Sequence, residues 1–174
     1  METNATAVST TSVGLRYGLL TGLVSILFSF VLYVTQSDQS PVRWLALVIL
    51  IGAMVLAHNA YKQAQGGFMN YSEGLAIGTV MSGISGVLST AFSYVYMTFV
   101  DPQYMGRAME ITRTKMEEQG QMTDEQIDAA VNMAQKFSSG GWLVVFGVVG
   151  SLLLGFLFAL VVSAFTKHSK PEFE

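Results

Sequence analysis

The chain contains no cysteine, only two histidines and three prolines, and few charged residues. Without cysteine it has no disulfides, no thiolate metal sites and no cysteine nucleophile. Charged residues make up 12% of its 174 residues, whereas a soluble domain carries roughly 25%. The net charge is -3 and no basic run is present, so we expect no nucleic-acid partner.

The sequence also lacks the common catalytic motifs, among them H-E-x-x-H, G-x-S-x-G and the phosphate-binding G-x-x-x-x-G-K-[ST]. Asp124, Glu125 and Asp128 are close together, but they lack the ligand spacing of an EF-hand. We therefore expect no enzymatic activity, no metal and no cofactor.

Four long stretches without a charged residue dominate the sequence. They are residues 17–35, 44–61, 74–100 and 142–166. A helix rises ~1.5 Å per residue and the hydrocarbon core is ~30 Å thick, so about 20 apolar residues cross it. The sequence predicts an all-α membrane protein, a single membrane domain over residues 1–174, with transmembrane helices at about residues 14–35, 43–62, 73–100 and 141–167.

Basic residues near the span ends slightly favour one orientation. With four spans, both termini lie on one side of the membrane. That side carries more lysine and arginine close to the spans than the other, and such residues favour the cytoplasm. We predict cytoplasmic termini. The residues compared are Arg16, Lys62, Lys167 and Lys170 on the terminal side, and Arg43, Arg107 and Lys136 on the other.

Small residues recur every four positions along three of the spans. Residues four apart share one helix face, and small side chains allow close helix packing inside a bilayer. This pattern fits packing within one four-helix bundle, and it also fits a homodimer. The predicted packing residues are Gly14, Gly18 and Gly22, then Gly78, Ser82 and Gly86, and finally Gly147, Ser151, Gly155 and Ala159.

The segment between spans three and four, residues 101–139, predicts an extramembrane helical hairpin. Asp101 is a good N-cap and Pro102 suits the first helical position, so a helix is expected to start there and to end at Gly120. Thr123 and Gln126 have the spacing of a capping box, which predicts the start of a second helix.

Apolar residues of this hairpin are candidates for a partner-binding face. Five of the ten methionines lie in the segment, and methionine adapts readily to partners. The alternative is that these faces pack on each other, on the span ends or on the lipid interface. The candidate partner face consists of Met105, Met109, Ile127 and Val131.

A few polar residues lie near the terminal-side ends of the spans. Arg16, His58, Lys62 and Glu73 can converge there, because the connection between spans two and three is short. These side chains can act as caps and interfacial anchors, or they can form a polar cluster that binds a lipid headgroup or a small anion.

Several short segments resemble those of a bacterial four-span membrane protein family known as domain of unknown function 4199. They are residues 67–74 (GFMNYSEG), 101–104 (DPQY) and 122–127 (MTDEQI), followed by a glycine-rich last span with a basic end. The resemblance implies a multi-pass protein of the bacterial inner membrane. It implies no activity, substrate or catalytic residue.

Three classes of function remain after these exclusions. The favoured one is a non-catalytic scaffold or partner-binding membrane protein that acts through the 101–139 hairpin. The alternative is a small transporter or channel, although the spans offer no charged group at mid-depth to grip an ion. An intramembrane enzyme would need catalytic groups that the sequence does not show.

Overall fold

The structure is a computed structural model that describes residues 8–138 and 140–169, and this part of the chain is helical. A short 3-10 turn, η1 (Pro41–Trp44), precedes the second long helix, and a π-helical turn, η2 (Tyr96–Val100), extends the third. The predicted all-α class is confirmed. The α-helices are α1 (Thr10–Val34), α2 (Leu45–Ala64), α3 (Tyr71–Val95), α4 (Tyr104–Gln119), α5 (Asp124–Phe137) and α6 (Gly141–Thr166).

Four of the helical segments are long and apolar enough to cross a membrane. They contain 25, 24, 30 and 26 residues and include η1 and η2. The predicted spans agree with them to within a few residues at each end. Helices α4 and α5 lie in the chain between the third and fourth spans, as predicted. The candidate spans are Thr10–Val34, Pro41–Ala64, Tyr71–Val100 and Gly141–Thr166.

The chain divides into two compact units. The first, here called the span unit, comprises residues up to Ser89 together with those from Val148 onward. It holds α1, α2, most of α3 and most of α6. The second, here called the hairpin unit, comprises Thr90–Gly147 and contains η2, α4 and α5.

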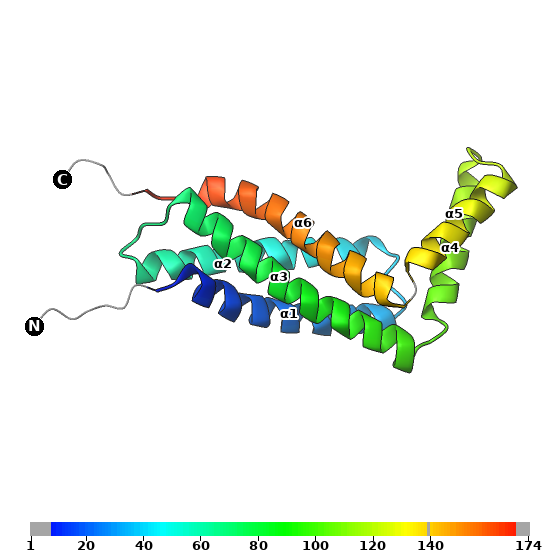
Figure 1. The fold of residues 1–174 in the computed structure, drawn as a ribbon, viewed down its shortest axis with the longest axis horizontal. Helices are drawn as coiled ribbons and strands as arrows, with labels where there is room; N and C mark the ends of the chain where they lie inside the picture. Colours follow the sequence, from blue (N-terminus) through cyan, green and yellow to red (C-terminus); the bar gives the residue numbers. More distant parts are fainter. Residues whose placement is uncertain (1–7, 139, 170–174) are drawn as a thin grey trace, which may run out of the picture. The chain divides into compact units, whose positions relative to one another are not determined.

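In the span unit, α1 packs against α2 and α3, and the helices run lengthwise beside one another (Figure 1). The predicted packing residues of α1 all face α3. A Cβ at Gly14 would lie 2.9 Å from the Cβ of Val80, and one at Gly18 would lie 2.9 Å from the carbonyl oxygen of Met81. Gly22 lies against Leu88 and Ser85. The absence of a side chain at these positions therefore lets the two backbones approach closely.

Helices α3 and α6 approach each other in the same way. Gly78 lies against Ala159, Gly86 against Ser151, and Gly155 against Ser82. In the hairpin unit, Gly147 of α6 lies against Thr90 of α3. Whether the same residues also serve a homodimer stays a prediction.

The interior of the span unit is small and rich in methionine. Met54, Ile77 and Met81 are fully buried, whereas large apolar side chains such as Leu27 and Val48 are exposed on its outside. A water-soluble bundle would bury such residues. The exposed apolar surface of the candidate spans implies contact with the lipid bilayer.

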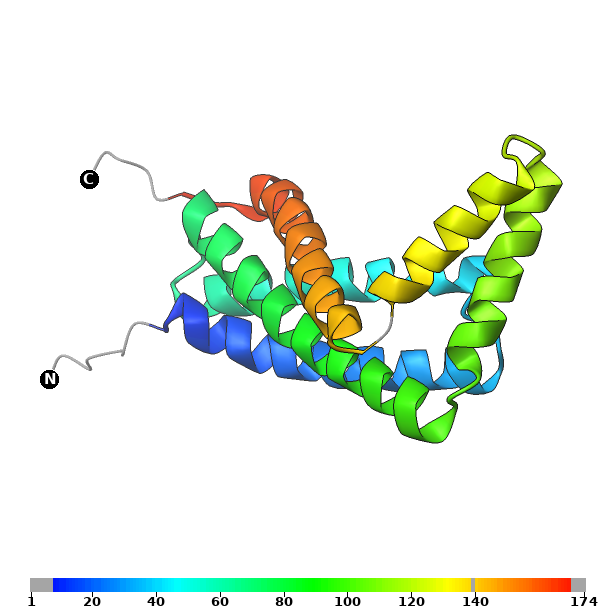
Figure 2. The same ribbon diagram turned by 45° about the vertical axis from the view of Figure 1, so that its right-hand side comes forward.

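In the hairpin unit, α4 and α5 pack against each other and run in opposite directions from a turn at Gly120 (Figure 2). Gly120 has φ +61°, a left-handed conformation that glycine adopts without strain. Thr123 begins α5 with the predicted capping box: its hydroxyl accepts from the Gln126 N–H, and the Gln126 side chain accepts from the Thr123 N–H. The predicted Ser139 end of the hairpin lies outside the described residues.

The predicted start of the first hairpin helix is wrong. Helix α4 begins at Tyr104, its N-cap is Gln103, and no side chain caps it. The Asp101 carboxylate instead forms an ion pair with Arg107. Asp101 is therefore not an N-cap, because a guanidinium on the second turn of α4 engages its side chain in place of the backbone N–H groups.

Candidate functional site

At one end of the span unit, α2 ends, α3 begins and α6 ends, beside the start of α1 (Figure 1). Polar side chains gather at this end. Two backbone hydrogen bonds join Met69 to His168, with N–O distances of 2.9 and 2.8 Å. The Phe68 ring stacks on the His168 ring with centroids 5.5 Å apart. These contacts attach the connection before α3 to the segment that follows α6.

His58 is the central buried polar group of this end and is 0% exposed. Its Nε2 lies 3.0 Å from the Gly74 carbonyl, and its Nδ1 lies 2.8 Å from the Thr166 hydroxyl. A carbonyl only accepts, so Nε2 carries a hydrogen. In the neutral ring Nδ1 carries no hydrogen and can accept the single hydroxyl hydrogen of Thr166. The Val162 carbonyl, 2.8 Å from the same hydroxyl, is the other acceptor for that hydrogen. One histidine thus joins α2 to both α3 and α6.

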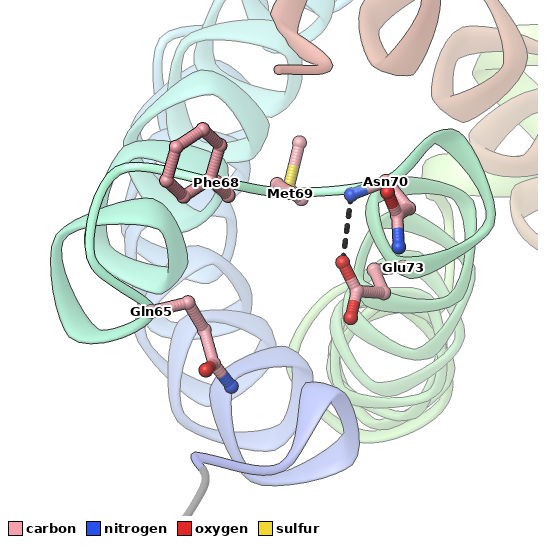
Figure 3. Close-up of a pocket in the computed structure, with 5 residues that line it drawn as sticks. All are labelled: Gln65, Phe68, Met69, Asn70 and Glu73. Carbon is pink, nitrogen blue, oxygen red and sulfur yellow. Dashed lines mark hydrogen bonds between the residues drawn. The ribbon is translucent and has the colours of Figure 1, made fainter. Parts of the chain in front are cut away.

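Glu73 lies at the start of α3 and forms one wall of a cavity of about 220 Å³ (Figure 3). Its carboxylate accepts from the Tyr61 hydroxyl at 2.9 Å and from the Asn70 N–H at 2.7 Å. Near a helix N-terminus, this acid also complements the helix dipole. The other lining residues are Gln65, Phe68, Met69 and Asn70.

A second, open cavity of about 480 Å³ lies between α2 and the end of α6. Lys62 donates from Nζ to the Thr166 carbonyl at 3.2 Å, so a cation stands at the C-terminus of α6. Lys167 follows directly in the chain and also lines the cavity. We call this cavity the basic hollow. Its lining residues are Asn59, Lys62, Gln63, Gly67, Phe165, Thr166, Lys167 and His168.

Three of the four residues of the predicted polar cluster lie at this end. His58, Lys62 and Glu73 are linked to neighbouring helices by the hydrogen bonds described above. Arg16 is exposed on α1, and no hydrogen bond or ion pair joins it to the other three among the described residues. Lys170, which entered the prediction of orientation, lies outside the described residues.

The predicted partner face of the hairpin stays a prediction, and its four residues are less exposed than other apolar residues of the hairpin. Ile127 is only 2% exposed, and Met105, Met109 and Val131 are partly buried. Other apolar side chains of the two helices and of the turn between them are exposed. They are Ile111 (40% exposed), Met122 (49%), Met133 (63%) and Phe137 (45%).

Phe137 differs from the other exposed apolar residues because it contacts aromatic rings at the start of α6. Its centroid lies 6.5 Å from that of Trp142 and 5.3 Å from that of Phe146, both edge-on. Ile111, in contrast, lines an open hollow of about 500 Å³ along α4, together with Arg107, Glu110, Thr114, Lys115 and Glu118.

Comparison with protein families shows a match over residues 16–168. The chain belongs to the DUF4199 family. The family description reads "Protein of unknown function", and the match includes nearly all of the four candidate spans and both hairpin helices. No curated protein and no solved structure matches the chain. The family resemblance seen in the sequence is confirmed, and it assigns no activity to any residue.

Sequence reasoning missed several contacts at the polar end of this DUF4199 protein. Met69 pairs with His168, which lies far away in the chain, and no local sequence pattern predicts this contact. Nothing in the sequence indicated that Thr166 contacts His58, because Thr166 is simply the last residue of the uncharged stretch 142–166. Asn70 and Glu73 did give a signal, because their spacing is that of a capping box, and the Glu73 half of that box is present.

Proposed function

We propose that this DUF4199 protein is a non-catalytic, multi-pass protein of the bacterial inner membrane that binds a protein partner through the α4–α5 hairpin. The observation that supports it is the exposure of Ile111 and Met133 on a hairpin whose two helices are already joined. The four candidate spans would anchor this hairpin at the bilayer surface, with the chain termini in the cytoplasm.

The two helices of the hairpin pack against each other, with Ile127 buried, and one exposed ion pair also links them. Arg113 of α4 contacts Glu117 on its own helix at 2.9 Å and Asp128 of α5 at 2.7 Å. The hydrogen bond that Arg113 donates to Glu117 and the charge of Asp128 raise the pKa of Arg113 above its ordinary value. A surface that is formed before binding loses less conformational entropy when a partner docks.

The charge of the hairpin indicates the chemistry of the partner. Acids outnumber bases in the segment, so a partner segment with lysine or arginine around apolar residues is complementary. Met133 and Ile111 would contact its apolar side chains, and methionine adapts to their shape. The acids are Asp101, Glu110, Glu117, Glu118, Asp124, Glu125 and Asp128, and the bases are Arg107, Arg113, Lys115 and Lys136.

Photo-crosslinking in native membranes tests this function. A photoreactive residue replaces Met133, and the matched control replaces Gln135, which is also exposed but lies two positions along α5 on a different face. We expect a discrete polypeptide adduct from position 133 and a much weaker one from position 135. The adduct should decrease when Ile111 is changed to Glu, because a carboxylate in an apolar contact must be desolvated.

Two results would contradict the proposal. One is recovery of lipid adducts alone from position 133. The other is an identical set of protein adducts from positions 133 and 135, since nonspecific proximity does not depend on the helix face.

The alternative of a small transporter or channel stays a prediction. Transport requires a polar site near mid-depth of the spans. The two cavities described above in the span unit, around Glu73 and around Lys62, lie at its end.

A further inference from the structure

The basic hollow has the charge and the surroundings of a site for an anionic headgroup. Lys62, Lys167 and His168 line it, together with the amides of Asn59 and Gln63, and its lining among the described residues contains no acid. Neither Glu73 nor any other carboxylate belongs to this lining, and Glu73 is engaged by Tyr61 and Asn70. Among the described residues, the hollow therefore offers several donors and no competing anion.

The helix dipoles disfavour an anion in the hollow, but their effect is weaker than that of the two lysine charges. Both α2 and α6 end at the hollow, and each helix C-terminus corresponds to roughly half a negative charge. Lys62 and Lys167 contribute two full positive charges. Lys62 already uses one donor on the Thr166 carbonyl, which leaves two of its three N–H groups for a ligand. The balance therefore favours an anion.

An apolar stripe on α6 leads directly to the hollow. Leu157, Val161 and Phe165 are spaced four residues apart, so they share one face of the helix, and all three are exposed. Phe165 is 86% exposed and lines the hollow itself. A molecule with a charged head and an apolar chain can thus place the head among the lysines and the chain along this stripe.

We propose that the basic hollow binds the phosphate of an anionic phospholipid whose acyl chain lies along the exposed face of α6. Lys62 and Lys167 contact the phosphate, while Asn59 and Gln63 donate to the remaining headgroup oxygens. Basic pockets between membrane helices on the cytoplasmic side bind acidic lipids in this way. The site is separate from the hairpin and does not depend on the proposed partner function.

Native mass spectrometry of the detergent-solubilised full chain tests the proposal. The protein is titrated with phosphatidylglycerol or with phosphatidylcholine of the same acyl chains, and the bound lipid is counted. The wild type should retain phosphatidylglycerol in preference to phosphatidylcholine. Lys167→Gln should reduce the affinity for phosphatidylglycerol about fivefold, which is the contribution of one lysine at an anionic membrane surface.

The matched control is Lys136→Gln, which removes an equal charge from the hairpin unit and should leave lipid retention unchanged. Equal losses in the two variants would overturn the proposal, because the effect would then follow net charge alone. Equal retention of the two lipids by the wild type would overturn it without any variant. Inorganic phosphate provides the third arm: if it displaces phosphatidylglycerol from the wild type at equal concentration, the site recognises free phosphate and the lipid assignment is wrong.

Discussion

At the residue scale, Gly155 and Gly150 differ in whether the neighbouring helix leaves room for a side chain. Both lie in α6, but a Cβ at Gly155 would collide with Ser82 of α3, whereas a Cβ at Gly150 would have no neighbour within 4 Å. The colliding atoms of Ser82 include its Cβ, which no side-chain rotation can move away. The helices themselves would have to separate.

We therefore predict opposite effects of the same substitution at these two sites. Gly155→Ala should lower the free energy of unfolding by about 1–3 kcal/mol, the usual cost of overpacking. Gly150→Ala should raise it by about 0.5–1 kcal/mol, because alanine restricts the unfolded chain and favours the helix. Unfolding of both variants in the same detergent checks this. Equal stability of the two would show that the α3–α6 contact is not close in the folded protein.

His58 allows a second prediction at this scale, because it joins three helices through two hydrogen bonds. His58→Phe and Thr166→Val should each destabilise the fold by about 1 kcal/mol or more, since each removes a partner from a buried polar contact. The double variant should lose less than the sum, by about 1 kcal/mol, because both changes break the same bond. Strictly additive losses in unfolding experiments would mean that the two side chains do not interact.

At the scale of the helix, residues that begin or end a helix were predicted correctly where no distant side chain bound the same group. The capping box at Thr123 and the end of α4 at Gly120 involve only neighbours along the chain, so the sequence predicted both. Asp101 is equally local, but Arg107 on the next helix competes for its carboxylate. The preference of aspartate for N-cap positions is a property of that residue type. It takes no account of an arginine elsewhere that binds the same carboxylate.

Substitution of the capping residue tests the start of α5. Thr123→Ala should destabilise the first turn of α5 by about 1 kcal/mol. The amides of residues 124–127 should therefore exchange with solvent hydrogen faster, and hydrogen-exchange mass spectrometry can measure this. Thr114→Ala is a suitable control, since that hydroxyl only bonds back to the Glu110 carbonyl within an exposed part of α4. Similar exchange in the two variants would contradict the capping role.

For the molecule as a whole, the spans were the most predictable feature and the polar end the least. Hydrocarbon thickness fixes the length of a span, so composition alone located all four to within a few residues. The polar end depends instead on pairs such as His58 with Thr166 and Met69 with His168, which lie far apart in the chain. The sequence predicted that polar residues would meet there, but not which of them would bond.

The cysteine-free chain makes the four-span arrangement directly measurable. Single cysteines introduced by Ser9→Cys, Ala64→Cys, Ser169→Cys, Ser37→Cys and Gln121→Cys mark the ends and the connections of the spans. A membrane-impermeant maleimide is applied to intact cells and then to permeabilised cells. The four-span arrangement with cytoplasmic termini predicts labelling of positions 37 and 121 in intact cells, and labelling of positions 9, 64 and 169 only after permeabilisation. Labelling of positions 64 and 121 from the same side would contradict the crossing of the third span and with it the four-span topology.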